Sequence, residues 1–218
     1  SVIGVGAKYL ARPSAEIVGL IGVGVISRTQ LMALHASMKN IRHVKLFSRT
    51  NEKAQAFANE MSEHLDLEIQ IVDSAQSAIV GADIVAPAIS VGQSTHYIQP
   101  EWIKAGAYLA NLSANDYSFD AISICDRIIV DNKYQLQVPD LTLTNMIAQG
   151  KLNPDDVHEL AAIVNGKKKG RTHDDERIFF SPFGMGILDL INAFNIYQEA
   201  CRQGVGQELN LWGDPQWI

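Results

Sequence analysis

The sequence has few of the features that mark several common protein classes. Its two cysteines, Cys125 and Cys201, stand far apart, which excludes a disulfide framework and a cysteine zinc site. The longest apolar run, near Ile17–Ile26, is broken by glycines and is too short to cross a bilayer. The first residues lack a basic region followed by an apolar core, so we expect no signal peptide and a cytoplasmic protein.

Positive charge and aromatic residues are also scarce. The 218 residues include 18 Lys and Arg against 24 Asp and Glu, a net charge of -6, which disfavours nucleic acid as a partner. No pair of histidines has metal-ligand spacing on a plausible element, so we expect no metal site. Aromatic residues make up 7% of the chain and glycines number 16, which favours an α/β fold over a β-sandwich.

What the chain does have is an alternation of short β-branched runs and helical patterns. We expect strands at 17–22, 44–47, 67–72, 84–88, 107–112, 127–130 and 178–180, and helices at 1–10, 25–38, 52–64, 74–80, 141–149, 155–164 and 184–203. Nearly continuous Val, Ile and Leu runs are typical of parallel strands buried on both faces. The sequence therefore predicts an α/β fold with a Rossmann-type, doubly wound, mostly parallel sheet.

The same pattern predicts four segments. Residues 1–14 form a helix that leads in from a preceding domain, because the chain begins in the body of a helical pattern. Residues 15–135 form a dinucleotide-binding core, and residues 136–177 complete it with helices. Residues 178–218 form a returning strand and a long amphipathic C-terminal helix.

A glycine turn follows the first predicted strand. Gly22 permits a tight turn, and Gly24 lets the backbone approach a pyrophosphate at the start of a helix. Ser27 takes the place of the usual third glycine and is small enough for helix–strand packing. In this strand–turn–helix context we favour a dinucleotide site over a plain tight turn.

The end of the second strand predicts which dinucleotide binds. NAD sites usually place a carboxylate there, whereas this chain has Ser48, Arg49 and Thr50. The guanidinium of Arg49 can pair with a 2′-phosphate, and the two hydroxyls can donate to it. We therefore expect NADP(H) to be favoured over NAD(H), the alternative being a solvated arginine.

Further polar candidates follow later strands. Ala88, Ile89 and Ser90 end the fourth strand and should border the nicotinamide ribose. Asn115 and Asp116 are the best-placed pair for proton transfer or for holding a substrate amine, although either residue could equally cap the helix that starts near Ser118. His96, in the loop after the fourth strand, is a weaker catalytic candidate.

Several segments together resemble the ornithine cyclodeaminase/mu-crystallin family. They are Ala7–Arg12 before the glycine turn, Ser48–Ala58, the Glu101–Gly106 loop and the returning segment Ser181–Asp189. The resemblance implies an NAD(P)-binding oxidoreductase that acts on amino acids or cyclic imines, as a homodimer in its full-length form. It also implies a substrate and dimerisation domain before Ser1, to which the C-terminal helical segment returns. Because no apolar run is long enough to cross a bilayer, we expect no membrane partner.

The resemblance also assigns residues by position. Gly24, Val25 and Ile26 would touch the pyrophosphate, and Ser48, Arg49 and Thr50 would hold the adenosine ribose and its phosphate. The nicotinamide side of the cleft would be lined by Ala88, Ile89, Ser90, Leu112, Ser113, Pro182 and Phe183.

Two departures leave the reaction open. The catalytic aspartate of the cyclodeaminases falls at Asn115, or at Asp116 with a one-residue shift. Tyr117–Ala121, with Asp131 and Ser181–Gly184, is more similar to the diaminopropionate-biosynthesis dehydrogenases. We therefore expect an amino-acid or imine dehydrogenase, with a cyclodeaminase that recycles NAD and a non-catalytic, crystallin-like NADP(H)-binding protein as alternatives.

Overall fold

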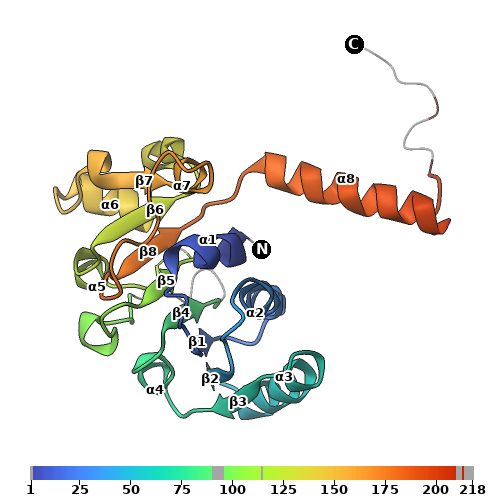
Figure 1. The fold of residues 1–218 in the computed structure, drawn as a ribbon, viewed down its shortest axis with the longest axis horizontal. Coiled ribbons are helices and arrows are strands. Elements are labelled where there is room, and N and C mark those ends of the chain that lie inside the picture. The colour runs from blue at the N-terminus through green and yellow to red at the C-terminus, as the bar shows by residue number, and fades with distance from the viewer. Residues whose placement is uncertain (1, 90–95, 114, 210–212, 214–218) are drawn as a thin grey trace. The chain divides into compact units, whose positions relative to one another are not determined.

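A parallel β-sheet organises the chain. The computed structural model describes residues 2–89, 96–113, 115–209 and 213. In this part of the chain the sheet has eight strands in the order β3-β2-β1-β4-β5-β8-β6-β7 (Figure 1), and every pairing is parallel. The strands are β1 (Ile17–Ile21), β2 (His43–Phe47), β3 (Glu68–Ile71), β4 (Ile84–Pro87), β5 (Tyr108–Ala110), β6 (Arg127–Val130), β7 (Val157–Glu159) and β8 (Ile178–Ser181).

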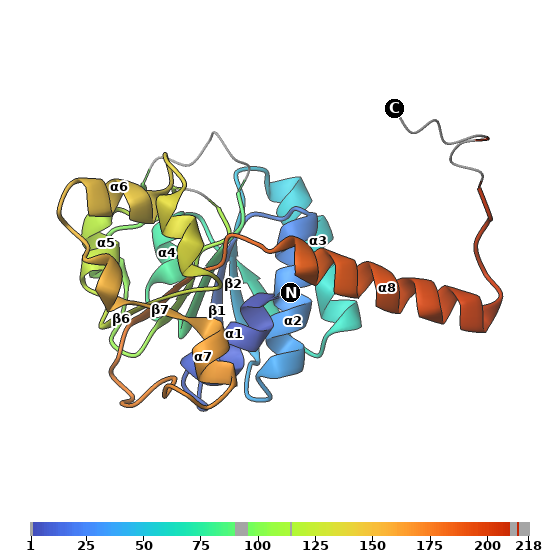
Figure 2. The same ribbon diagram turned by 90° about the horizontal axis from the view of Figure 1, so that it is seen from above.

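Helices cover both faces of the sheet (Figure 2). One hydrophobic core joins the sheet to α1 (Val2–Leu10), α2 (Val25–Ser37), α3 (Asn51–His64) and α7 (Leu160–Val164). The other joins it to α4 (Ala75–Ile79), α5 (Phe119–Ser123) and α6 (Thr142–Ala148). Successive strand residues alternate between the two cores, as Leu20 and Ile21 do, which explains why the strands are apolar throughout.

The chain reverses its winding direction between β1 and β4. Strands β2 and β3 extend the sheet from one side of β1, and β4 and β5 extend it from the other. The loops that leave β1 and β4 therefore diverge at the carboxyl edge of the sheet, where ligands bind in open α/β folds. The predicted fold class is confirmed, and the strand boundaries agree with the prediction within one or two residues.

One predicted helix, 155–164, is wrong in its first half. Asn153 caps only a short 3-10 turn, η3 (Pro154–Asp156), by accepting from the N–H of Asp155. The chain then enters β7, whose Val157 is fully buried and pairs with Ile128 of β6. Pairing with the sheet overrides the local helical pattern, and the helix α7 begins only at Leu160.

The C-terminal helix α8 (Gly186–Gln203) belongs to a separate compact unit, 184–218. It has the predicted amphipathic pattern, with apolar residues at Ile187, Leu190, Ile191, Phe194 and Tyr197, all of them exposed. It ends at Gly204, whose φ of 65° is left-handed. No helix in the described ranges combines the length and apolarity needed to cross a membrane.

Asp83 joins the opening helix to the sheet. Its buried carboxylate accepts hydrogen bonds from the backbone N–H groups of Glu16 and Ile17, both at 2.9 Å, and from Arg12. Lys104 adds an ion pair at 2.6 Å. Burial raises the pKa of this carboxyl, but the hydrogen bonds from Lys104, from the two backbone groups and from Arg12 outweigh burial, so its pKa lies below the ordinary value.

We expect Asp83→Ala to lower the free energy of unfolding by about 3 kcal/mol, because it leaves two half-buried cations and two backbone donors without their partner. Glu68→Ala is the control, since it removes only the exposed pair with His43 and should change stability by less than about 0.5 kcal/mol. Urea unfolding at pH 7 measures both variants. Equal, small effects of the two substitutions would contradict the assignment.

The pH dependence of stability gives a second measure of the same group. The folded pKa is depressed, so the contribution of Asp83 is fully present above the unfolded value of about 3.9 and is lost as the pH falls through the lower folded value. Stability of the parent chain should therefore fall more steeply than that of Asp83→Ala below about pH 4.

Candidate functional site

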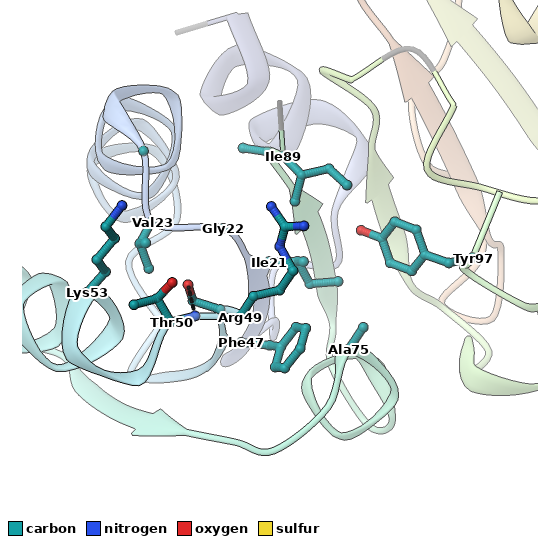
Figure 3. A pocket seen from close by; sticks show the side chains of 13 residues that line it. Ile21, Gly22, Val23, Phe47, Arg49, Thr50, Lys53, Ala75, Ile89 and Tyr97 are labelled. Atoms are coloured by element: carbon teal, nitrogen blue, oxygen red, sulfur yellow. Dashed lines mark hydrogen bonds between the residues drawn. The ribbon is translucent and has the colours of Figure 1, made fainter. Parts of the chain in front are cut away.

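A cavity of about 450 Å³ lies at the carboxyl edge, where the loops after β1, β2 and β4 meet (Figure 3). The lining residues come from the glycine turn, the end of β2, the start of α3, α4, the end of β4 and the loop beyond it. They are Ile21, Gly22, Val23, Gly24, Phe47, Ser48, Arg49, Thr50, Lys53, Ala75, Ala88, Ile89 and Tyr97. The position matches the one expected for a ligand of a doubly wound sheet.

Backbone hydrogen bonds hold the glycine turn against its neighbours. The N–H of Gly22 donates to the carbonyl of Phe47, and the N–H of Ala88 donates to the carbonyl of Ile21. Gly22 has a φ of 102°, and a Cβ there would lie 2.5 Å from the carbonyl oxygen of Ala88. Only glycine fits this position, because a side chain would meet both the strained φ and the neighbouring backbone.

Gly24 is different, because its side of the turn is open. A Cβ built on Gly24 meets nothing within 4 Å. Gly24 is also the N-cap of α2, and no side chain caps that helix. The N–H groups at the start of α2 therefore remain available to an anion, as at a pyrophosphate-binding turn.

Arg28 supports the turn, a role that the sequence analysis missed. Its guanidinium donates to the carbonyl of Val23 at 2.8 Å and forms a bidentate pair with Glu60 of α3. The side chain thereby ties the turn to the next helix. Arg28 lies one turn into the helix after the glycines, a spacing that could have suggested contact back to the turn.

The end of β2 is the polar part of the cavity. Ser48, Arg49 and Thr50 line it, and Thr50 is the N-cap of α3 without using its side chain as a cap. Figure 3 shows Arg49 reaching from the end of β2 to a point between Ile89 and Tyr97. No carboxylate is among the lining residues that the structure describes, so this part of the cavity is cationic.

Lys53 is a second cation that the sequence analysis did not single out. It lies in the first turn of α3 and lines the cavity beside Thr50 (Figure 3). A lysine there opposes the helix dipole, and its ammonium has no hydrogen bond or ion pair within the described ranges. The sequence signal that could have identified Lys53 is a cation in the first turn of a helix, shortly after an arginine and two hydroxyl residues.

The remaining residues predicted to bind the cofactor lie in different places. Val25 and Ile26 are exposed at the start of α2 and do not line the cavity, whereas Ala88 and Ile89 do. Ser90 lies outside the described residues. Leu112, Ser113, Pro182 and Phe183 meet instead at a second cavity, of about 180 Å³, beyond the ends of β5, β6 and β8.

Neither predicted catalytic residue lines this second cavity. Asn115 is half-buried, and its Oδ1 accepts from the hydroxyl of Thr142 at 3.0 Å, which places it behind a lining residue. Asp116 is fully buried. Neither caps α5, because Ser118 does so by accepting from the N–H of Ala121. The catalytic roles of Asn115 and Asp116 stay predictions.

His96 is held in place by its surroundings. Its Nδ1 lies 2.8 Å from the carbonyl oxygen of Tyr117, and its ring packs edge-on against Phe119. Among the described residues, no group of three or more His, Cys, Asp or Glu side chains is arranged to hold a metal ion.

The fold and the loops at its carboxyl edge define a Rossmann-type α/β protein. A profile of the ornithine cyclodeaminase/mu-crystallin family matches residues 1–204, so the chain belongs to this family.

Three similar proteins share this fold or sequence. N-((2S)-2-amino-2-carboxyethyl)-L-glutamate dehydrogenase of Staphylococcus aureus is 28% identical, over 95% of this chain and 62% of its own. Delta(1)-pyrroline-2-carboxylate reductase of Bacillus cereus is 30% identical, and the match covers 95% of this chain and 65% of the reductase. The structure of the Thermococcus litoralis Delta(1)-pyrroline-2-carboxylate reductase, solved with NADH and L-proline, matches with a TM-score of 0.87 and 31% sequence identity. This match covers 95% of this chain and 65% of the reductase. The chain thus spans less than two thirds of each.

We expect Gly24→Ala to affect ligand binding and Gly22→Ala to affect the stability of the fold. Gly24→Ala places its methyl in open space and should change the free energy of unfolding by less than about 1 kcal/mol, yet weaken dinucleotide binding at least about tenfold. Gly22→Ala should destabilise the fold by about 2 kcal/mol or more. Thermal melts and calorimetric titration with NADPH measure the two effects. Undiminished binding by Gly24→Ala would show that no ligand approaches this turn.

Proposed function

We propose that this chain is the dinucleotide-binding part of an NADP(H)-dependent oxidoreductase that acts on a small amino acid or cyclic imine. The observation that carries the proposal is the cavity at the carboxyl edge, which combines an open helix N-terminus with a cationic end. The names of the relatives supply the substrate class, because they are an amino-acid dehydrogenase and imine reductases.

The residues present fit a dinucleotide. The open side of Gly24 and the uncapped N–H groups of α2 suit a pyrophosphate, whose negative charge the helix dipole favours. The strand ends beside the turn offer an apolar wall for the adenosine, made by Phe47, Ala75 and Ile89. The volume of about 450 Å³ is in the range of small-molecule sites.

The preference for NADP(H) rests on charge. A 2′-phosphate at the end of β2 would meet Arg49, Lys53 and two hydroxyls, and none of the described lining residues carries a carboxylate that would repel it. The Thermococcus litoralis relative was solved with NADH, so NADH is the competing cofactor. The two cations are what should shift this chain toward NADP(H).

When bound, the cofactor supplies hydride transfer, and the protein supplies binding, orientation and electrostatics. The second cavity, lined by Ser113, Pro182 and Phe183, is where the nicotinamide and the substrate would meet. Its described lining sets hydroxyls and amides among apolar side chains, which suits a small substrate with both polar and apolar groups. Asn115 would act there through Thr142, and Asp116 from the buried side, in moving a proton or holding a substrate amine.

We expect Arg49→Asp to weaken NADPH binding by about 1–3 kcal/mol, because it replaces a charge-assisted pair with repulsion. Lys53→Ala should weaken it less, and NADH binding should change little in both. Lys39→Asp, a charge change of the same sign on an exposed residue outside the cavity, is the control. Calorimetric titrations with NADPH and NADH test this, and equal affinity of Arg49→Asp and the parent for NADPH would remove the role given to Arg49.

The proposed proton-transfer residues need a turnover assay of the full-length gene product. We expect Asn115→Ala and Asp116→Ala to lower kcat by about 10²-fold or more if either moves the proton. The assay follows nicotinamide absorbance with imines and amino acids and measures ammonia in parallel. Unchanged turnover in both variants would exclude the role. Ammonia release with no net change in absorbance would identify a cyclodeaminase, and nucleotide binding without any turnover a non-catalytic binding protein.

A further inference from the structure

The hydroxyl of Tyr97, a half-buried residue, differs from those of the fully buried Tyr108 and Tyr117. Tyr108 donates to the carbonyl of Ile3, and Tyr117 lies within hydrogen-bond distance of the carbonyls of Val85 and Ala110. The Tyr97 hydroxyl is equally removed from solvent, yet it has no hydrogen-bond partner within the described ranges. A buried polar group without a hydrogen-bond partner lowers the stability of the fold. A bound ligand that supplied the missing partner would explain why the group is there.

The position of Tyr97 is fixed by its neighbours in the chain. The N–H of His96 donates to the carbonyl of Asn115, and the N–H of Ile98 donates to the carbonyl of Asp116. The N–H of Ser118 in turn donates to the carbonyl of Ile98. Backbone hydrogen bonds on both sides of Tyr97 therefore hold its backbone in place.

The side chain reaches the first cavity. Tyr97 lines it together with Phe47, Ala75 and Ile89. Figure 3 shows its hydroxyl directed into the cavity, on the side away from Thr50 and Lys53. Tyr97 thus supplies a hydroxyl to the end of the cavity opposite Lys53, where Phe47, Ala75 and Ile89 are apolar and the guanidinium of Arg49 also reaches. A flat, largely apolar ligand with hydrogen-bonding atoms on its edge fits that end.

The phenol remains protonated. Burial, and then the negative charge of Asp116, raise the pKa of Tyr97 far above its ordinary value. A protonated phenol both donates and accepts one hydrogen bond, as the edge of a purine does.

We propose that the Tyr97 hydroxyl hydrogen-bonds the edge of the adenine base of the bound dinucleotide, which makes Tyr97 a residue that selects for the base. This inference rests on the proposed function, because it requires a dinucleotide in the cavity. It differs from the role of Arg49 and Lys53, since the base is common to NADPH and NADH. Loss of Tyr97 should therefore affect both cofactors alike.

Tyr97→Phe separates a ligand-binding role from a structural one. Removing an unpartnered buried hydroxyl should leave the melting temperature of the ligand-free chain unchanged or raise it. The same change should weaken binding of NADPH, NADH and 2′,5′-ADP by a similar factor, about five- to tenfold. Nicotinamide mononucleotide, which has no adenine, should bind the variant and the parent equally.

Tyr134→Phe is the matched control, because Tyr134 is exposed and lines none of the cavities described above. Calorimetric titration and thermal melts of the parent and both variants complete the experiment. Unchanged affinity of Tyr97→Phe for NADPH and NADH would overturn the inference, as would a lowered melting temperature together with weaker binding of every probe. A parent chain that binds none of the adenine nucleotides would instead overturn the proposed function, and the inference with it.

Discussion

The close approach of the loops after β1 and β4 is the constraint on which the site depends. Gly22 lies against the backbone of Ala88 so tightly that a methyl group would not fit, and its N–H is bound to the end of β2. This contact brings three loops to one edge of the sheet. The start of α2 has no side-chain cap, and its N-cap residue Gly24 lines the same cavity as Arg49 and Lys53.

In the proposed function, the two sides of the first cavity have different parts in recognition. Arg49 and Lys53 provide charge, which would distinguish ligands by their phosphate groups and would weaken with salt. Phe47, Ala75, Ile89 and Tyr97 provide shape and a hydroxyl, which would distinguish ligands by the base. The second cavity, beyond β5, β6 and β8, presents hydroxyls and amides among apolar side chains, and none of its described lining residues is charged. Under this proposal, affinity and chemistry depend on separate parts of the carboxyl edge.

Local sequence signals located most of the first cavity but less of the second. The glycine turn and the Ser48–Thr50 segment were found because each follows a strand directly, and their function depends on local backbone geometry. Lys53 and Tyr97 were not singled out, because their place beside the cavity depends on how α3 and the loop after β4 pack. Asn115 and Asp116 follow β5, but which of their atoms reach a cavity depends on packing against α6 and the loop at Tyr97.

The sequence by itself determined the parallel, doubly wound sheet and the turn after its first strand. Continuous apolar strands and a glycine pair before a helix require no long-range information. The tertiary structure decided that Val157–Glu159 is a strand, because its partner β6 lies 27 or more residues earlier in the chain. It also decided that the Tyr97 hydroxyl is buried without a partner while those of Tyr108 and Tyr117 are satisfied. Burial and pairing depend on residues distant in sequence, so they follow only from the folded chain.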